Sequence, residues 1–128
     1  GLRRPGSDSD ATNSNGANYI AMLFASVDGI SKVGYYDGAD ADFTVTTGFA
    51  PRFVIIKRVN QAENWVVLDT TRGWGPGAEN DAALFLDTTS AQNSNLPLGY
   101  PTSNGFNVYS GNGWVGANGG KFIYYAHA

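Results

Sequence analysis

Three aspartates fall close together at positions 37, 40 and 42, beside Gly38. Hard cations such as Ca²⁺ take several oxygen ligands from one loop, which makes Asp37, Asp40 and Asp42 candidate metal ligands. Their spacing differs from that of an EF-hand loop, and no Glu follows that could bind the ion in a bidentate manner. We therefore expect a solvated acidic turn, with no metal and no cofactor.

The tryptophans are the other side chains with an evident binding chemistry. Trp74 and Trp114 lie in Gly-rich segments that read as loops, where exposed aromatic rings could stack on the apolar faces of surface glycans. The alternative, which we prefer, is that these rings cap the ends of the domain or pack at a subunit interface. Trp65 lies in an apolar strand pattern and is predicted to belong to the core.

The chain contains few of the residue types that catalytic sites usually use. There is no Cys and only one His, His127, which excludes disulfides, thiol catalysis and Cys-based metal sites. A hydrolase built on carboxylates alone needs two of them about 5–10 Å apart across a cleft. Nothing in the spacing of Glu63, Asp69, Asp81 and Asp87 singles out such a pair. The sequence therefore predicts a protein that is not an enzyme.

Length and charge narrow the classes of partner. The 128 residues suit one domain, and 8 Lys plus Arg against 11 Asp plus Glu give a net charge of −3. A general nucleic-acid binder needs a basic stripe to displace counterions, so we expect no nucleic-acid partner. The longest apolar run, residues 19–27, is about half the ~20 residues that a membrane helix needs, so we expect no membrane insertion.

The elements that must position these residues read as short strands. Charge is scarce, while the 17 Gly and the many aromatic residues favour strands joined by tight turns. Strands are predicted at 19–25, 31–36, 43–47, 52–58, 64–69, 82–87, 105–109 and 121–126, with residues 88–104 irregular. This pattern predicts an all-β, jelly-roll-like antiparallel β-sandwich of about eight strands at residues 17–128, behind a flexible polar N-terminal tail at 1–16.

One apolar segment occurs twice. Residues 15–25 align with residues 118–128 at a constant offset, with identities at Asn15/Asn118, Gly16/Gly119, Ile20/Ile123 and Ala25/Ala128. Both segments can be ordinary buried strands that follow a Gly turn. Alternatively, residues 17–26 are a spare closing strand, which pairs inside its own sandwich or completes the sheet of a neighbouring subunit. The residues of this candidate assembly strand are Tyr19, Ile20, Ala21, Met22, Leu23 and Phe24.

Several motifs in a fixed order carry a family resemblance. They are FASVDGISKVG at 24–34, GFAPRFVIIKR at 48–58, NW at 64–65, DTTRG at 69–73, LFLDTTSA at 84–91, SNGFNV at 103–108 and ANGGKFIY at 117–124. Together they resemble a β-rich module of virion proteins from marine and environmental tailed bacteriophages, where it occurs in tail-fibre-like or particle-surface proteins. The resemblance covers residues 17–128 and implies a place on a virion surface or another extracellular structure.

The expected function follows from the spare strand, the polar tail and the scarcity of catalytic groups. We expect a structural subunit of an extracellular or virion fibre that forms a homo-oligomer or helical polymer. Assembly would use β-strand complementation and aromatic contacts, with residues 17–26 filling an edge groove of the next subunit. The alternative is an adhesion module of a phage tail fibre that binds a carbohydrate or another receptor.

Overall fold

The computed structural model describes residues 14–77 and 81–128, and in them it has nine strands and one short 3₁₀ helix. The elements are β1 (Ser31–Asp37), β2 (Phe43–Thr46), β3 (Phe53–Arg58), β4 (Trp65–Asp69), η1 (Thr70–Arg72), β5 (Asp81–Phe85), β6 (Asn93–Leu96), β7 (Gly99–Thr102), β8 (Gly105–Val108) and β9 (Lys121–His127). Most of the predicted tail at 1–16 lies outside the described residues, so its flexibility stays a prediction.

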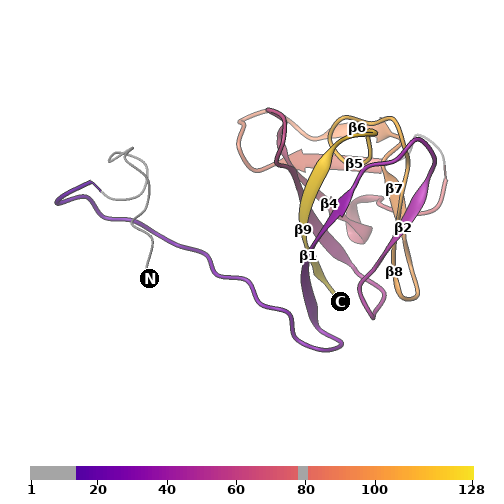
Figure 1. Ribbon diagram of the computed structural model, residues 1–128, viewed down its shortest axis with the longest axis horizontal. Helices are drawn as coiled ribbons and strands as arrows, with labels where there is room; N and C mark the ends of the chain where they lie inside the picture. The colour runs from indigo at the N-terminus through magenta and orange to yellow at the C-terminus, as the bar shows by residue number, and fades with distance from the viewer. Residues whose placement is uncertain (1–13, 78–80) are drawn as a thin grey trace.

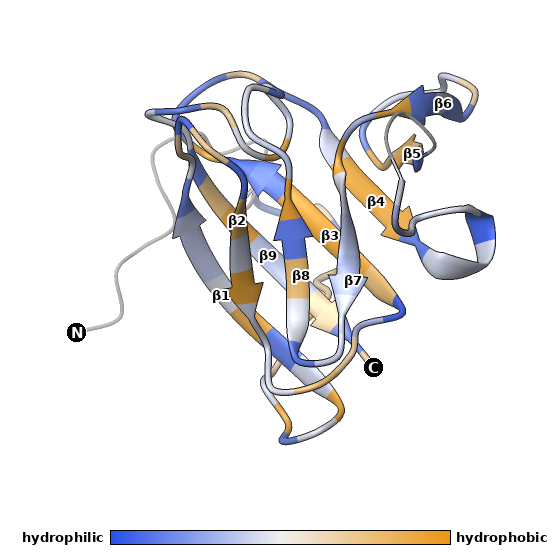
Figure 2. Ribbon diagram, turned by 90° about the vertical axis from the view of Figure 1, so that its right-hand side faces the viewer, coloured by the Kyte–Doolittle hydropathy of each residue, from blue (hydrophilic) through white to orange (hydrophobic). Residues whose placement is uncertain are grey.

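The strands form two antiparallel sheets. Six strands make the larger sheet in the order β1-β9-β3-β4-β5-β6, and three make the smaller one in the order β2-β8-β7. The smaller sheet covers the larger one on one side, as Figures 1 and 2 show from two directions. The prediction of an all-β antiparallel sandwich is confirmed, and so is the hairpin of β3 and β4.

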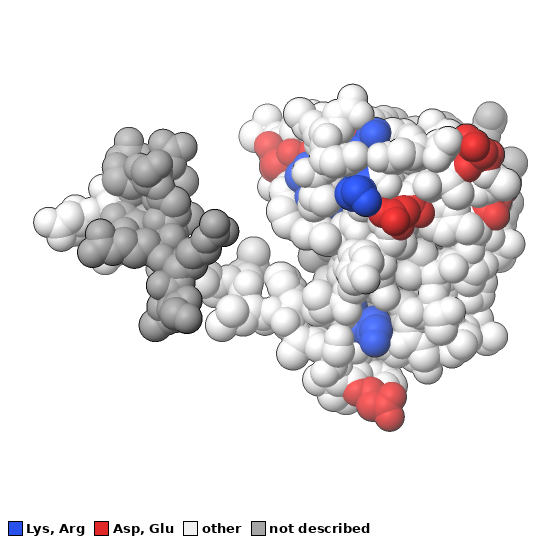
Figure 3. All heavy atoms as spheres, viewed as in Figure 1, with Lys and Arg blue, Asp and Glu red and all other residues white. Residues whose placement is uncertain are grey.

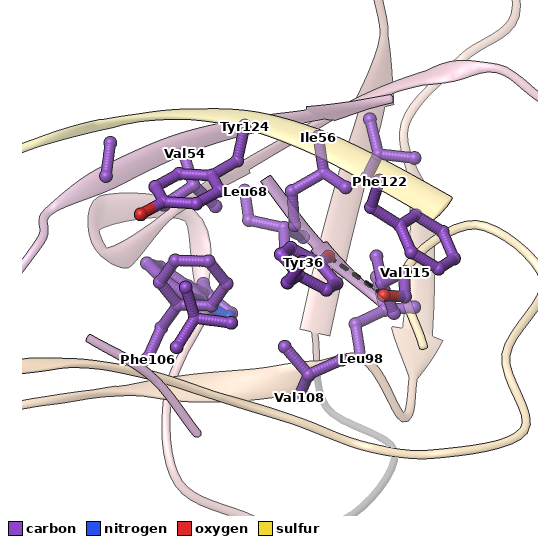
Figure 4. Close-up of a cluster of buried hydrophobic side chains, with 14 of the residues drawn as sticks. Tyr36, Val54, Ile56, Leu68, Leu98, Phe106, Val108, Val115, Phe122 and Tyr124 are labelled. Atoms are coloured by element: carbon purple, nitrogen blue, oxygen red, sulfur yellow. Dashed lines mark hydrogen bonds between the residues drawn. The ribbon is translucent and has the colours of Figure 1, made fainter. Parts of the chain in front are cut away.

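The core lies between the two sheets. In β9 burial alternates strictly, so that Phe122, Tyr124 and Ala126 point inward, as a strand with one covered face requires. The smaller sheet contributes Val45, Phe106 and Val108 to the same cluster (Figure 4). Tyr36 stands in the middle with its ring stacked on Phe122, and its hydroxyl donates a hydrogen bond of 2.8 Å to the carbonyl of Val115. Burial raises the pKa of Tyr36 well above its usual value.

Two sequence expectations about strands are wrong. Residues 19–25 form no strand, and residues 88–104, expected to be irregular, contain β6 and β7. Both missed strands lie at sheet edges, where pairing on one side suffices. The residues of these two strands do not show a strand pattern. β6 reads Asn-Ser-Asn-Leu, and β7 contains Pro101, which has no backbone N–H to donate to a neighbouring strand.

Candidate assembly surface

The apolar segment that precedes β1 leaves the domain instead of joining it. Residues 14–26, here called the arm, extend away from the sandwich on the side of the larger sheet (Figure 1). The side chains of Ile20, Met22 and Leu23 are 97%, 78% and 95% exposed. The predicted burial of this segment is therefore wrong within one subunit. Large apolar side chains this exposed in a row are unusual on a folded surface and typically mark a contact with another molecule.

The root of the arm is fixed by a tight turn. Val27 and Ser31 form a β-bridge, and the Ser31 hydroxyl donates a hydrogen bond of 2.8 Å to the carbonyl of Ala25. The Ser26 hydroxyl accepts a bond of 3.0 Å from the N–H of Val33 and lies 3.5 Å from the Val33 carbonyl oxygen. These contacts occupy the free edge of β1 over its first residues and fix the point where the arm leaves the sheet.

The outer face of the larger sheet is apolar where it meets the arm. The ring of Phe24 lies 4.6 Å from that of Tyr125. Beside them is a cleft of about 500 Å³. Its lining consists of Met22, Phe24, Val33, Ile55, Trp65, Leu86, Asp87, Ile123, Tyr124 and Tyr125. The outer face of an antiparallel sandwich sheet is ordinarily polar because it meets water, so an apolar cleft there is a second candidate contact surface.

Trp65 stands in the wall of this cleft and is 39% exposed, which corrects its predicted place in the core. Its backbone N–H donates a bond of 3.0 Å to the Asp87 carboxylate, and its carbonyl accepts a bond of 3.1 Å from the N–H of Leu86. The wall formed by Trp65 and Leu86 is therefore held by hydrogen bonds in the single subunit.

The two tryptophans considered for glycan stacking lie elsewhere. Trp74 is only 2% exposed and packs edge-on against Phe106 in the core, so it cannot stack on a surface ligand. Trp114 is half-buried and makes an edge-to-face contact with Phe85 at 5.0 Å. The structure does not bring the two rings together as an exposed platform. Their loops fold inward, in line with the preferred reading as rings that pack.

The three aspartates of the acidic segment each contact a different partner. Asp37 pairs with Lys121 at 3.3 Å, and Asp40 accepts a bond of 2.6 Å from the side-chain amide of Asn118. Asp42 accepts a bond of 2.8 Å from the backbone N–H of Ser110. Across residues 14–77 and 81–128 no group of three or more His, Cys, Asp or Glu side chains could hold a metal ion. Each of the three aspartates thus ties a different pair of segments together.

One buried carboxylate was not singled out by the sequence. Asp81, fully buried at the start of β5, accepts bonds of 2.8 and 3.0 Å from the backbone N–H groups of Leu98 and Gly99. The N–H of Gly75 lies 3.4 Å from its other oxygen. Burial raises the pKa of Asp81 above its usual 3.8, and the three N–H groups oppose that shift. The residue ties β5 to the loop before β7, and no sequence signal distinguishes it from the exposed aspartates.

A family model for a domain of unknown function, DUF7483, matches residues 6–128. The chain belongs to the DUF7483 family. No curated protein and no solved structure matches it. The DUF7483 match does not test the resemblance to phage virion modules, which stays a prediction.

The DUF7483 domain also has a feature that sequence reasoning missed, namely the outer-face cleft. Its members Ile55, Trp65 and Ile123 come from three different strands and were read as ordinary strand residues. The available signal was the apolar residue at every position of β3 from Phe53 to Ile56, which leaves no polar face for water.

Within the described part of the chain, no helix is long and apolar enough to cross a membrane.

Proposed function

We propose that this chain is a non-enzymatic structural subunit of a fibre, which assembles by donating its arm to the next copy. The observation that carries the proposal is the exposure of Ile20, Met22 and Leu23 on an arm that leaves its own domain. Burying one such side chain stabilises a complex by about 1.5–3 kcal/mol. Removing the side chains of the arm from water would therefore strongly favour association.

The repeat supports a role for the arm as a strand. Its equivalent in the second copy of the motif is β9, which pairs with β1 on one side and β3 on the other. A segment with this residue pattern can thus form a well-packed strand when neighbours are present. In the described residues the arm has no strand neighbour, apart from the bridge at its root. A neighbouring copy would supply what the arm lacks.

The arm's reach and composition also suit donation. Residues 14–17 form a turn, and the nine residues 18–26 that follow would span about 30 Å when fully extended, enough to pass from one small domain to the next. The described arm carries no charged side chain and is drawn white in Figure 3. Asp87 is the one charged residue among those that line the cleft, so little charge would repel another copy there. One surface gives and a different surface receives, so the contact is heterologous and builds a filament when its rotation does not close.

The place of such a fibre would be a virion surface or another extracellular structure, as the resemblance to phage modules implies. The glycan-binding alternative loses half of its support, since Trp74 is buried. Of the two loop tryptophans that it invoked, Trp114 keeps partial exposure, and its ring makes an edge-to-face contact with Phe85.

Negative-stain electron microscopy with light scattering on the full chain tests the proposal. We expect filaments with a regular subunit repeat, and we expect the double variant Ile20→Asp, Leu23→Asp to remain as single chains. The control is Val59→Asp, which places one such charge on a 54% exposed apolar residue in the β3–β4 turn. Assembly by the arm variant, or single chains in the wild type at every concentration, would reject the proposal.

A further inference from the structure

The receiving surface of the donated arm can be located on the same molecule. We propose that the outer-face cleft of the larger sheet receives residues 19–23 of a second copy; this rests on the proposed function and names its acceptor. The cleft is defined by its sheet floor, Val33, Ile55, Ile123 and Tyr125, its wall, Trp65 and Leu86, and its second side, Met22 and Phe24 of the subunit's own arm.

The free edges at β1, β6 and β7 are poor acceptors by comparison. At β1 the Val27 bridge and the Ser26 hydroxyl already occupy the first positions of the edge. At β6 the exposed residues Asn93, Ser94 and Asn95 offer polar side chains, and at β7 Pro101 interrupts the backbone donors. Binding of an arm rich in apolar side chains is most favourable where it covers exposed apolar surface. In the described structure the cleft offers such a surface.

The two-sided lining of the cleft matches the two-sided arm. Tyr19, Ile20, Met22 and Leu23 put apolar side chains on both faces of an extended segment. On a flat sheet one of those faces would stay in water. In the cleft one face meets Ile55 and Ile123 on the sheet, and the other meets Met22 and Phe24 of the receiving subunit. A volume of about 500 Å³ accommodates several such side chains.

A subunit's own arm does not fill its own cleft. Phe24 seats on Tyr125 at the arm's root, and the chain then turns outward, leaving Ile20 and Leu23 almost fully exposed. Met22 and Phe24 therefore line the cleft, while the exposed side chains of Ile20 and Leu23 can be covered by the next subunit. In this arrangement every added copy covers one cleft and presents a new one, which is the repeat that a filament needs.

The absence of Cys from the chain allows a direct test by cross-linking. One full-length chain carries Ala21→Cys in the arm, and a second carries Leu86→Cys in the cleft wall. Under mild oxidation a heterodimer between the two can form only across subunits. The matched control pairs Ala21→Cys with Val59→Cys, since Val59 and Leu86 are exposed to nearly the same extent, 54% and 58%. We expect at least about tenfold more heterodimer from the 21/86 pair, the ratio that corresponds to a site preference of ~1.4 kcal/mol.

The outcomes separate this inference from the proposed function. If Ile20→Asp, Leu23→Asp prevents assembly but the 21/86 and 21/59 pairs give equal yields, arm donation stands and the cleft is the wrong acceptor. If the 21/86 link forms equally well with those two charges in the arm, the link is not guided by apolar docking and the inference fails. The cleft variant Ile123→Glu should prevent assembly as well, while its urea unfolding shows whether the domain itself remains folded.

Discussion

The arm and β9 carry related sequences in opposite environments. In β9, Phe122 and Tyr124 are buried and the strand pairs with neighbours along both sides. At the equivalent places in the arm, Tyr19 and Ala21 are exposed, and no sheet includes them in the described structure. The residue pattern thus specifies a segment able to form a strand, while the available neighbours decide whether it forms one.

The difference also separates two uses of apolar surface. The inward face of β9 is already buried within one subunit and stabilises the fold. The apolar side chains of the arm stay exposed in the single subunit. Their burial therefore contributes free energy only when another molecule covers them. Substitutions at equivalent positions should therefore affect different measurements, unfolding for β9 and assembly for the arm.

The largest contrast is expected between Phe122→Ala and Tyr19→Ala. Phe122 is 1% exposed between the sheets, and its truncation leaves a cavity that should lower the free energy of unfolding by about 3–5 kcal/mol. Tyr19→Ala removes a ring outside the domain and should change that free energy by less than ~0.5 kcal/mol. Urea unfolding at concentrations where light scattering finds single chains measures both. Comparable losses in the two variants would show that the arm packs on its own domain.

The next largest effect concerns the buried carboxylate that holds the packed region together. Asp81→Ala removes the acceptor of two well-formed N–H bonds, from Leu98 and Gly99, in a site with no exposure. Leaving these donors buried and unpaired should lower the free energy of unfolding by about 2–5 kcal/mol. Asp81→Asn keeps one oxygen acceptor and should lose less. Asp37→Ala, which breaks an exposed pair with Lys121, is the control and should be nearly neutral.

The same residue predicts a dependence on pH. Because burial raises the pKa of Asp81 in the folded state, the folded state disfavours the ionised form relative to the unfolded chain. The stability of wild type relative to Asp81→Asn should therefore be greatest below the unfolded pKa of about 3.8 and fall as pH rises through the raised folded value. Urea unfolding between acid and neutral pH measures the difference. A difference that grows with pH would show that the N–H groups outweigh burial.

The central strands β3 and β4 of the larger sheet could be predicted because their own residues show a clear strand pattern. The run from Phe53 to Ile56 and the run from Trp65 to Leu68 are apolar and bounded by a turn, and they form the β3–β4 hairpin as expected. The edge strands β6 and β7 could not, because pairing on one side tolerates polar residues and Pro101. Local pattern is informative where a strand pairs with neighbours on both sides and weak where it pairs on one side only.

The places of the tryptophans could not be predicted for a related reason. Trp74 follows a Gly and precedes another, which suggested an exposed loop, yet its ring is buried in the core against Phe106. Trp65 sits in an apolar strand, which suggested the core, yet its side of the sheet is left uncovered by the smaller sheet. Burial of a strand residue depends on which face the second layer covers, and that is a property of the whole topology.

The smallest effect is expected at the root of the arm, where its direction is set. Ser26→Ala removes the acceptor of the Val33 N–H and should cost about 0.5–1.5 kcal/mol locally, with little change in global unfolding. The measurement is the hydrogen-exchange rate of the Val33 amide, which should increase because that edge of β1 then opens to water. Ser103→Ala, in the exposed turn between β7 and β8, should leave the rate as it is. An unchanged rate in Ser26→Ala would mean that the Val27 bridge alone fixes the root, and the arm's direction would then be set by the turn at residues 27–31 rather than by its contact with the edge of the sheet.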